Sequence, residues 1–188
     1  MSHEDRTKWN ERYADSERAP TAPSLLLTAL EQQLPMSGRA LDIAGGGGRH
    51  AIWLARRGLD ATVVDISQAG LAIAEARARA AGVALQTRCR DLEVESLPEG
   101  PWNLIVSFHF LLRSLFAQIP TALAPGGLLV VVQPTLRNLE RHDRPPAPYL
   151  LEEGELPRLA AGLEVLHYEE GWLAEGRHDA LLVARRAS

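Results

Sequence analysis

The stretch Leu41–Ala55, LDIAGGGGRHAIWLA, places four consecutive glycines between a short apolar run and a segment with helical periodicity. Each glycine enlarges the conformational freedom of the unfolded chain, so a run of four opposes folding unless bare backbone is needed there. Two needs can explain it: a ligand that lies against the backbone, or close packing of the following helix on the strand. The flanking residues must decide between them.

The rest of the chain repeats the strand–helix alternation. Apolar runs predict buried strands, and 3.6-residue periodicity predicts helices between them. Strands joined by helices form right-handed parallel units, and two closing runs are predicted to pair antiparallel. The predicted fold is therefore α/β: a doubly wound, mostly parallel seven-stranded sheet with an antiparallel last strand and helices on both faces. The predicted strands are 40–44, 61–65, 84–88, 103–107, 128–132, 163–168 and 179–185, and the helices 49–57, 68–81, 111–123 and 151–161, with a turn at APGG (124–127).

Length and composition limit the classes of protein. A chain of 188 residues with 46% apolar and 23% charged residues predicts one domain, 1–188, with a buried core. The net charge of −4 argues against nucleic acid or a membrane surface as partner. One cysteine, Cys89, excludes an intramolecular disulfide, and the charged start lacks the apolar core of a signal peptide, so a cytoplasmic location is expected. Cys89 itself is predicted to be a small buried residue of the third strand.

The glycine stretch fits two ligands. From Gly46, GGGRHA matches G-x-G-x-x-A, and Asp65 ends the second strand, where an acid accepts hydrogen bonds from ribose hydroxyls. NAD and S-adenosylmethionine both carry such a ribose. A carboxylate just before the loop, Asp42, is poorly placed beside a pyrophosphate but suits an ammonium and a sulfonium. S-adenosylmethionine is therefore favoured, with NAD and a purely packing role as the alternatives.

These motifs carry a family resemblance. D-x-A-x-G-x-G at 42–48, the acid Asp65, Arg90-Asp91-Leu92 after the third strand and LAPGGLLVV at 123–131 resemble class I S-adenosylmethionine-dependent methyltransferases. The likeness covers nearly the whole chain. More narrowly, WNERY (9–13), FHFLLRSLF (108–116) and YLLEEGEL (149–156) resemble the tellurite-resistance methyltransferase group, which is similar to thiopurine S-methyltransferases. One departure is Ala44, where the family has glycine; an ordinary β backbone would accommodate its methyl group.

The resemblance implies a site for S-adenosylmethionine, with S-adenosylhomocysteine as product. Within it, residues 1–35 form a segment that covers the cofactor, in which Trp9 and Tyr13 act as a lid or, alternatively, as a hydrophobic staple. The implied contacts are Asp42, Ala44, Gly45, Gly46 and Gly48 for the methionine moiety; Asp65 for the ribose; Ile66, Asp91 and Leu92 for the adenine; and Ser107 for the methionine carboxylate or sulfonium.

Methyl transfer from a sulfonium requires mainly placement from the protein, because the cofactor supplies the reactive group. His109 follows the fourth strand, where the transferred methyl would point, and is a candidate base or a pocket-shaping residue. Arg113 is a second candidate: with Arg137, Arg141 and Arg144 of the loop 135–150 it predicts a basic collar over the active site, or alternatively a solvated mobile loop. The six histidines lack metal-ligand spacing, so no metal is expected.

The predicted function is methylation of a small molecule, either a soft sulfur, selenium or tellurium acceptor or an oxyanion. A soft, already anionic acceptor would need no general base. The only partner expected is this acceptor, with no nucleic acid and no membrane, in a monomer or homodimer. Two alternatives stay open: a catalytically idle module that binds the cofactor or a partner, and an NAD-linked oxidoreductase.

Overall fold

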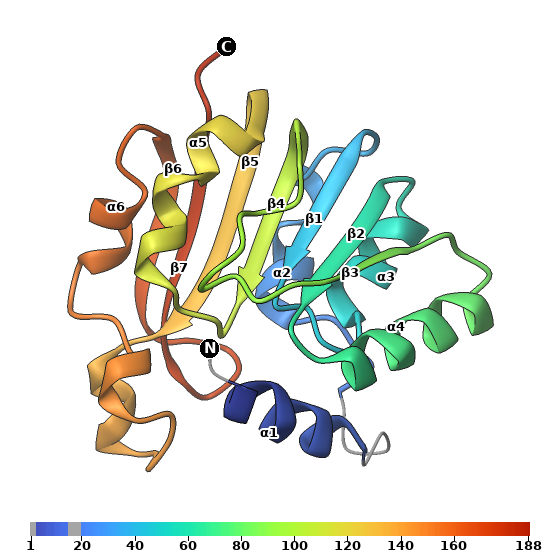
Figure 1. Cartoon of the computed structure of the whole chain (residues 1–188). Coiled ribbons are helices and arrows are strands. Elements are labelled where there is room, and N and C mark those ends of the chain that lie inside the picture. The colour runs from blue at the N-terminus through green and yellow to red at the C-terminus, as the bar shows by residue number, and fades with distance from the viewer. Residues whose placement is uncertain (1–2, 15–19) are drawn as a thin grey trace.

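The chain is described by a computed structural model that covers residues 3–14 and 20–188 (Figure 1). Positions 1–2 and 15–19 of the predicted covering segment lie outside the described residues. Seven strands form one sheet in the order β3-β2-β1-β4-β5-β7-β6. They are β1 (Arg39–Ile43), β2 (Asp60–Asp65), β3 (Gln86–Cys89), β4 (Trp102–Phe108), β5 (Leu123–Pro134), β6 (Glu164–Trp172) and β7 (His178–Arg185).

The strand directions confirm the predicted fold class. Strands β1 to β5 are parallel to one another, and β7 runs antiparallel to both β5 and β6. Helices cover both faces (Figure 1). They are α1 (His3–Ala14), α2 (Leu25–Ala29), α3 (Arg49–Arg56), α4 (Gln68–Ala80), α5 (Ile119–Ala122) and α6 (Glu155–Leu159), with short 3-10 turns η2 (Glu31–Gln33), η3 (Arg113–Ala117), η4 (Leu136–Glu140) and η5 (Ala147–Tyr149).

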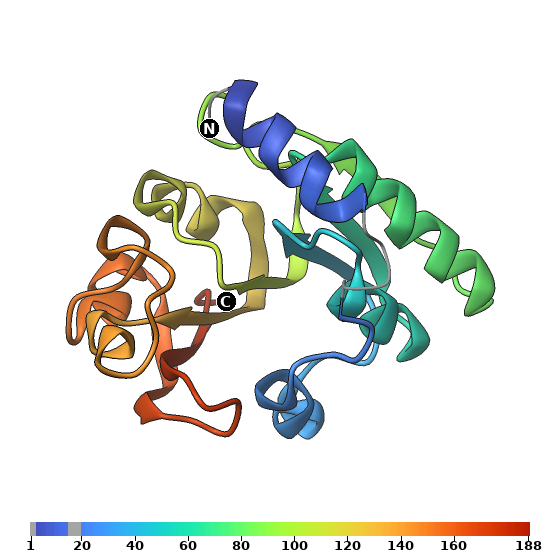
Figure 2. The same cartoon turned by 90° about the horizontal axis from the view of Figure 1, so that it is seen from below.

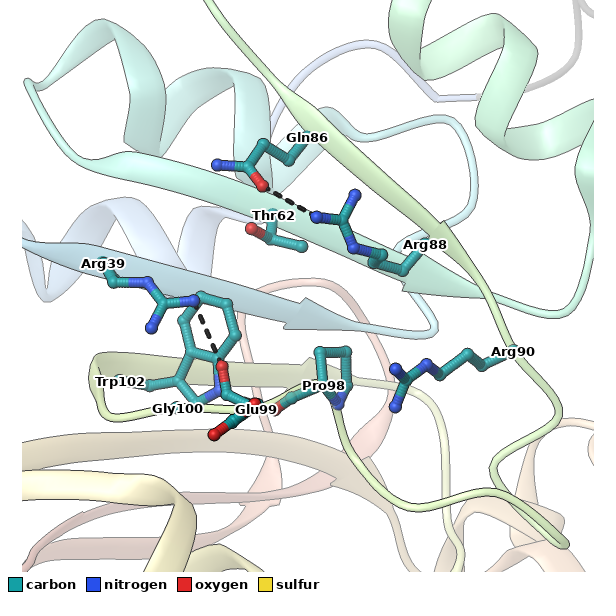
Figure 3. A pocket seen from close by; sticks show the side chains of 9 residues that line it. All are labelled: Arg39, Thr62, Gln86, Arg88, Arg90, Pro98, Glu99, Gly100 and Trp102. Atoms are coloured by element: carbon teal, nitrogen blue, oxygen red, sulfur yellow. Dashed lines mark hydrogen bonds between the residues drawn. The ribbon is translucent and has the colours of Figure 1, made fainter.

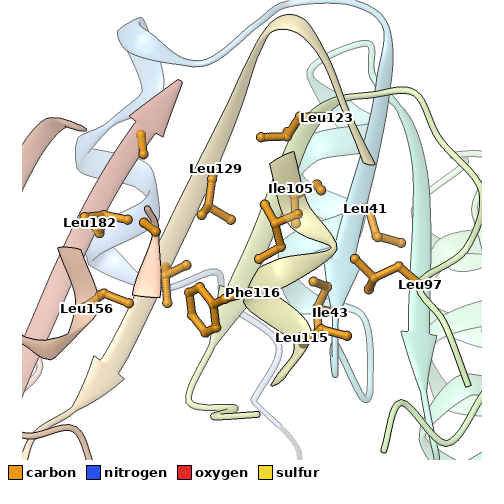
Figure 4. Packing of buried hydrophobic residues seen from close by; sticks show 14 of the residues in the cluster. Leu41, Ile43, Leu97, Ile105, Leu115, Phe116, Leu123, Leu129, Leu156 and Leu182 are labelled. Atoms are coloured by element: carbon orange, nitrogen blue, oxygen red, sulfur yellow. The ribbon is translucent and has the colours of Figure 1, made fainter. Parts of the chain in front are cut away.

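Apolar side chains from the strands fill a core on each face of the sheet. On one face, strand residues such as Ile43, Ile105 and Leu129 pack against Phe116 of η3 and Leu156 of α6 (Figure 4). On the other face, α2, α3 and α4 cover the strands. This two-sided burial explains why the central strands β4 and β5 contain continuous apolar runs, whereas the exposed edge strand β3 does not. In the described ranges, 3–14 and 20–188, no helix is long and apolar enough to cross a membrane.

The predicted helix 111–123 is wrong in length. The segment forms η3 and then the four-residue α5, and β5 already begins at Leu123, so the predicted turn at 124–127 lies within the strand. Pro120 explains the break, because it starts the first turn of α5 but cannot donate the hydrogen bond that would continue a helix from η3.

Two further predictions need correction. Only Glu155–Leu159 of the predicted helix 151–161 is helical, since Leu151 is held in a β-bridge with Thr135. Cys89 is exposed rather than buried. It ends β3, which is the edge strand and has β2 as its single neighbour, so the sheet covers one side of it only.

The strand order places a switch point between β1 and β4. From β1 the chain moves outward through β2 to β3, and then crosses to β4 on the other side of β1. Ligands of such sheets bind beyond the carboxyl ends of the strands at this point, because the connections diverge there and leave a crevice. Helix α1 lies across that edge and beside α4 (Figures 1 and 2).

Candidate functional site

The glycine loop follows β1, and two of its glycines are required by packing within the protein. A methyl group on Gly45 would lie 2.5 Å from the Asp42 carboxylate, and one on Gly48 would lie 2.8 Å from Ala74 of α4. Gly46 differs, because a methyl group there would lie 1.8 Å from the hydroxyl of Tyr13 in α1. Packing therefore accounts for these glycines, and at Gly46 the group that packs on the backbone is the Tyr13 side chain of α1.

Ala44 and His109 directly follow the adjacent strands β1 and β4 and have an unusual backbone conformation. Their φ angles are 52° and 58°, in the left-handed region. The expectation of an ordinary β backbone at Ala44 is therefore wrong, and the residue adopts a conformation that costs an L-amino acid roughly 1–2 kcal/mol. Strained residues of this kind cluster at functional sites. Both lie at the switch point.

Asp42 faces the start of α3. Its Oδ2 accepts a hydrogen bond from the Ala51 amide at 3.3 Å, where a negative charge is favoured by the helix dipole. Its Oδ1 is buried, has no hydrogen-bond partner among the described residues, and lies 3.9 Å from Nδ1 of His50. Oδ1 is thus the atom of Asp42 left for the predicted ligand ammonium.

Asp65 ends β2 and is bound to the loop. Its Oδ2 accepts from the Gly46 amide and its Oδ1 from the Ser67 amide, both at 2.8 Å. Burial raises the pKa of Asp65, and these two amide hydrogen bonds oppose the shift. Burial, together with the charge of Asp65, raises the pKa of Tyr13 to about 12, so the phenol stays protonated at physiological pH.

Helix α1 is fastened to α4 by Asn10. Its Oδ1 accepts from the Ser67 hydroxyl at 2.9 Å and from the Ala69 amide at 3.2 Å. The predicted lid residues Trp9 and Tyr13 stack with ring centroids 6.3 Å apart. The sequence analysis missed Asn10, although it lies inside the WNERY motif between them.

The residues predicted to contact adenine lie on neighbouring strands. Asp65 at the end of β2 pairs with Cys89 at the end of β3, which brings Ile66 and Asp91 to the same edge. Asp91 is 8% exposed and its Oδ1 accepts from the Glu93 amide at 3.0 Å. The side chain of Leu92 belongs to the core, which leaves its backbone for the predicted contact.

Ser107 lies near the carboxyl end of β4 and His109 directly follows this strand, so both border the switch point. The Ser107 hydroxyl donates to the Phe110 carbonyl at 3.5 Å. His109 has its Nε2 at 3.9 Å from Oδ2 of Asp179 and its ring nitrogens at 3.4–3.5 Å from Nη1 of Arg177. Asp179 is 0% exposed, and neither of its oxygens has a hydrogen-bond partner among the described residues. The sequence analysis missed Asp179 and Arg177, because nothing in their spacing links them to His109.

The predicted basic collar is reorganised. Arg113 does not join it, since its guanidinium binds both Glu155 oxygens, at 2.5 and 2.9 Å, and the carbonyls of Pro148 and Leu150. Arg137 pairs with Glu140. Arg177 lies beside Arg141 and Arg144 instead, and these three arginines line a hollow of about 460 Å³ together with His142 and Asp143.

Side-chain hydrogen bonds fasten the loop 135–150 to the sheet. The Asn138 amide group donates to the Arg144 carbonyl at 3.0 Å and accepts from the His178 amide at 3.3 Å. The Thr135 hydroxyl lies 2.7 Å from Nδ1 of His178. The segment that carries Arg141 and Arg144 is therefore held in place beside the sheet.

The Arg113–Glu155 pair is expected to stabilise the fold. The Arg113 guanidinium holds the pKa of Glu155 below its ordinary value of 4.5. The stabilisation that the ion pair provides is present above pH 4.5 and is lost as the pH falls through the pKa of Glu155 in the folded protein. Glu155→Gln should therefore lower the free energy of unfolding by about 1 kcal/mol at neutral pH, since the Arg113 side chain is 43% exposed and the pair is partly screened.

Urea unfolding of wild type and Glu155→Gln at about pH 7 and about pH 3 measures this contribution. Glu140→Gln is the control, because the Arg137–Glu140 pair is exposed and should contribute nothing measurable. An equal difference at both pH values would contradict the ion-pair account of Arg113.

Comparison with known proteins identifies the domain. A family described as "Methyltransferase domain" matches residues 40–127, from β1 to the turn inside β5. Residues 40–127 are therefore similar to a methyltransferase domain. A TehB-like S-adenosylmethionine-dependent methyltransferase from Corynebacterium glutamicum has the same fold, with a TM-score of 0.69 and 20% identity over 98% of this chain and 100% of that one. S-adenosylmethionine is the cofactor of this class, and the NAD-linked alternative has no support here.

Two other proteins are similar to this methyltransferase domain. A structure described as "Conversion of a Disulfide Bond into a Thioacetal Group during Echinomycin Biosynthesis" has a TM-score of 0.77 and 21% identity, covering 97% of this chain and 92% of that chain. Ribosomal RNA small subunit methyltransferase C of Alcanivorax borkumensis is 33% identical over 127 residues, which are 61% of this chain and 38% of that protein. The chain thus spans well under half the length of this relative.

Proposed function

We propose that the protein transfers the methyl group of S-adenosylmethionine to a small-molecule acceptor in the crevice at the β1/β4 switch point. One observation carries the proposal. The Gly46 backbone beneath Tyr13, the Asp65 carboxylate and the His109 imidazole come from the ends of β1, β2 and β4, and all three lie at the carboxyl edge of the sheet.

The residues present fit this cofactor. Gly46 offers backbone that a side chain would cover, and Asp65 is a buried carboxylate suited to accept hydrogen bonds from both ribose hydroxyls. Asp42 and the backbone at Ala44 and Gly45 would hold the methionine moiety, Ile66, Asp91 and Leu92 the adenine, and Ser107 would lie by the methionine carboxylate or sulfonium. When bound, the cofactor supplies an activated methyl group on sulfur.

His109 and Asp179 support acceptors that still carry a proton. In our proposal a ring nitrogen of His109 would accept the proton that the acceptor atom loses on methylation. The buried charge of Asp179, at 3.9 Å, stabilises the imidazolium that results, whereas Arg177 opposes it.

The acceptor class follows from the hollow lined by Arg141, Arg144 and Arg177. Guanidinium groups bind carboxylates and other oxyanions through paired hydrogen bonds, so an acceptor with an oxyanion group beside its sulfur, selenium or tellurium atom fits best. Tellurite-resistance-like chemistry is compatible with this. We propose no nucleic acid or membrane partner, a monomer or homodimer, and action in the cytoplasm.

An acceptor panel tests the proposal. The purified protein is incubated with S-adenosylmethionine and thiol carboxylates, selenite, tellurite or small-subunit ribosomal RNA, and S-adenosylhomocysteine is measured. Product with a small acceptor supports the proposal. Product with the RNA alone would overturn the acceptor class, and binding of S-adenosylhomocysteine without any product would favour an idle cofactor-binding module.

A further inference from the structure

A second basic hollow lies away from the crevice. Its volume is about 330 Å³, and it is lined by side chains of β1, β2 and β3 and by the segment that joins β3 to β4 (Figure 3). Arg39 and Trp102 are the first residues of β1 and β4, so the hollow reaches toward the amino ends of the strands whose carboxyl ends border the crevice.

Three arginines line this hollow, and all of their hydrogen bonds go to neutral groups. Arg39 donates to the Glu99 carbonyl at 3.1 Å, Arg88 to Oε1 of Gln86 at 3.1 Å and to the Thr87 carbonyl, and Arg90 to the Ser96 carbonyl at 2.9 Å. Within residues 3–14 and 20–188, none of the three forms an ion pair with a carboxylate.

The charge balance of the hollow is therefore positive. Glu99 is the one acidic residue of the lining, and it is exposed. The lining thus carries three guanidinium groups against one exposed carboxylate, and this excess of positive charge attracts an anion to the hollow. This concentration of positive charge is unexpected in a chain whose net charge is −4.

We propose that this hollow binds a small anion with a phosphoryl or diphosphoryl group. The planar guanidinium group of an arginine can donate two parallel hydrogen bonds to two oxygens of a phosphoryl group. A single carboxylate has only two oxygens and could form such a pair with one arginine only. The guanidinium of Arg39 lies 4.1 Å over the Trp102 ring, and Trp102 is 1% exposed, so no free aromatic face is left on which a nucleobase could stack. The negative net charge also disfavours a long polyanion, which selects a small ligand over a nucleic-acid strand.

The hollow is connected to the adenine side of the crevice by Arg90. This residue directly precedes Asp91 and Leu92, which belong to the proposed cofactor site, and the segment continues to Pro98 and Glu99, which line the hollow. An anion that holds Arg90 restrains this segment, so anion and cofactor should each strengthen binding of the other. This link rests on the proposed function, whereas the binding of the anion does not.

Calorimetric titration with inorganic pyrophosphate tests the site. Wild type should bind it, and Arg88→Glu should weaken binding at least about tenfold because it replaces one guanidinium by a repelling carboxylate. Arg39→Gln is a second variant that should act in the same direction. Arg79→Glu, an exposed change on α4, is the control for net charge, and Arg177→Gln is the control for the other basic hollow.

The outcomes are distinct. Loss of pyrophosphate binding in the Arg88 and Arg39 variants, with binding retained in both controls, supports the site. No binding by wild type, equal weakening in Arg79→Glu, or loss only in Arg177→Gln overturns it. Titration of S-adenosylhomocysteine with and without saturating pyrophosphate then tests the link: an affinity raised about threefold or more in wild type supports it, and an unchanged affinity overturns it. Normal S-adenosylhomocysteine affinity in Arg88→Glu without pyrophosphate shows that the cofactor site is intact, so failure here leaves the proposed function standing.

Discussion

Replacing Asp65 by alanine is expected to weaken binding of S-adenosylhomocysteine at least about 100-fold, which corresponds to about 2.7 kcal/mol. Two hydrogen bonds from ribose hydroxyls to one carboxylate would be lost, and bonds to a charged group contribute roughly 1.5–3 kcal/mol each. The carboxylate is already buried and is held in place by hydrogen bonds from the Gly46 and Ser67 amides. Little binding free energy is therefore lost in desolvating or reorienting it when the ribose binds.

The strand itself provides a matched control. Asp60 begins β2 at the opposite end from Asp65, is exposed, and accepts a hydrogen bond from Gln86 at 3.3 Å. Asp60→Ala should leave the affinity unchanged within about twofold. Thermal unfolding of both variants checks that the fold survives. Full affinity in a folded Asp65→Ala protein would place the ribose elsewhere and remove the main support for the proposed cofactor site.

The second large effect is expected at Asp179. Asp179→Asn should lower the rate of methyl transfer, measured in a single turnover, by about 100-fold or more for acceptors that carry a proton, because the imidazolium of His109 loses the charge that stabilises it. Its effect on S-adenosylhomocysteine affinity should be small, since Asp179 belongs to β7 and not to the glycine loop. Stability should rise or stay unchanged, because a fully buried carboxylate without hydrogen-bond partners among the described residues is replaced by a neutral amide.

Two comparisons separate this role from a purely structural one. If Asp179 acts through His109, the double variant with His109→Gln should be no slower than His109→Gln alone. An acceptor that is already anionic should be methylated by Asp179→Asn at nearly the wild-type rate. Additive losses in the double variant, or an equal loss with the anionic acceptor, would show that Asp179 acts in another way.

The sequence was sufficient to predict where those candidate residues lie that belong to one contiguous segment. The glycine loop, Asp65 and Arg90-Asp91-Leu92 each follow a strand directly, and parallel strands bring their carboxyl ends together without further information. The positions of the strands were predicted for the same reason, because strands buried on both faces must be apolar throughout.

Contacts between distant segments could not be predicted in this way. Arg113 has a basic side chain in a helical pattern, and only the folded chain shows that Glu155, 42 positions away, binds it. His109 and Asp179 are brought together by the pairing of β5 with β7, which no local spacing encodes. Cys89 was misjudged because its burial depends on which strand lies at the edge of the sheet, and the order of strands is set by packing of the whole domain.

The attachment of α1 bears on the timing of each catalytic cycle. Asn10 holds the helix to the Ser67 hydroxyl and the Ala69 amide, while Tyr13 rests on the backbone of Gly46. These contacts must break before a molecule as large as the cofactor can pass between α1 and the glycine loop. They can form again once it has passed. We therefore expect entry of the cofactor and escape of the spent product to be slow steps, so that the residence time of the product, rather than the transfer itself, limits turnover.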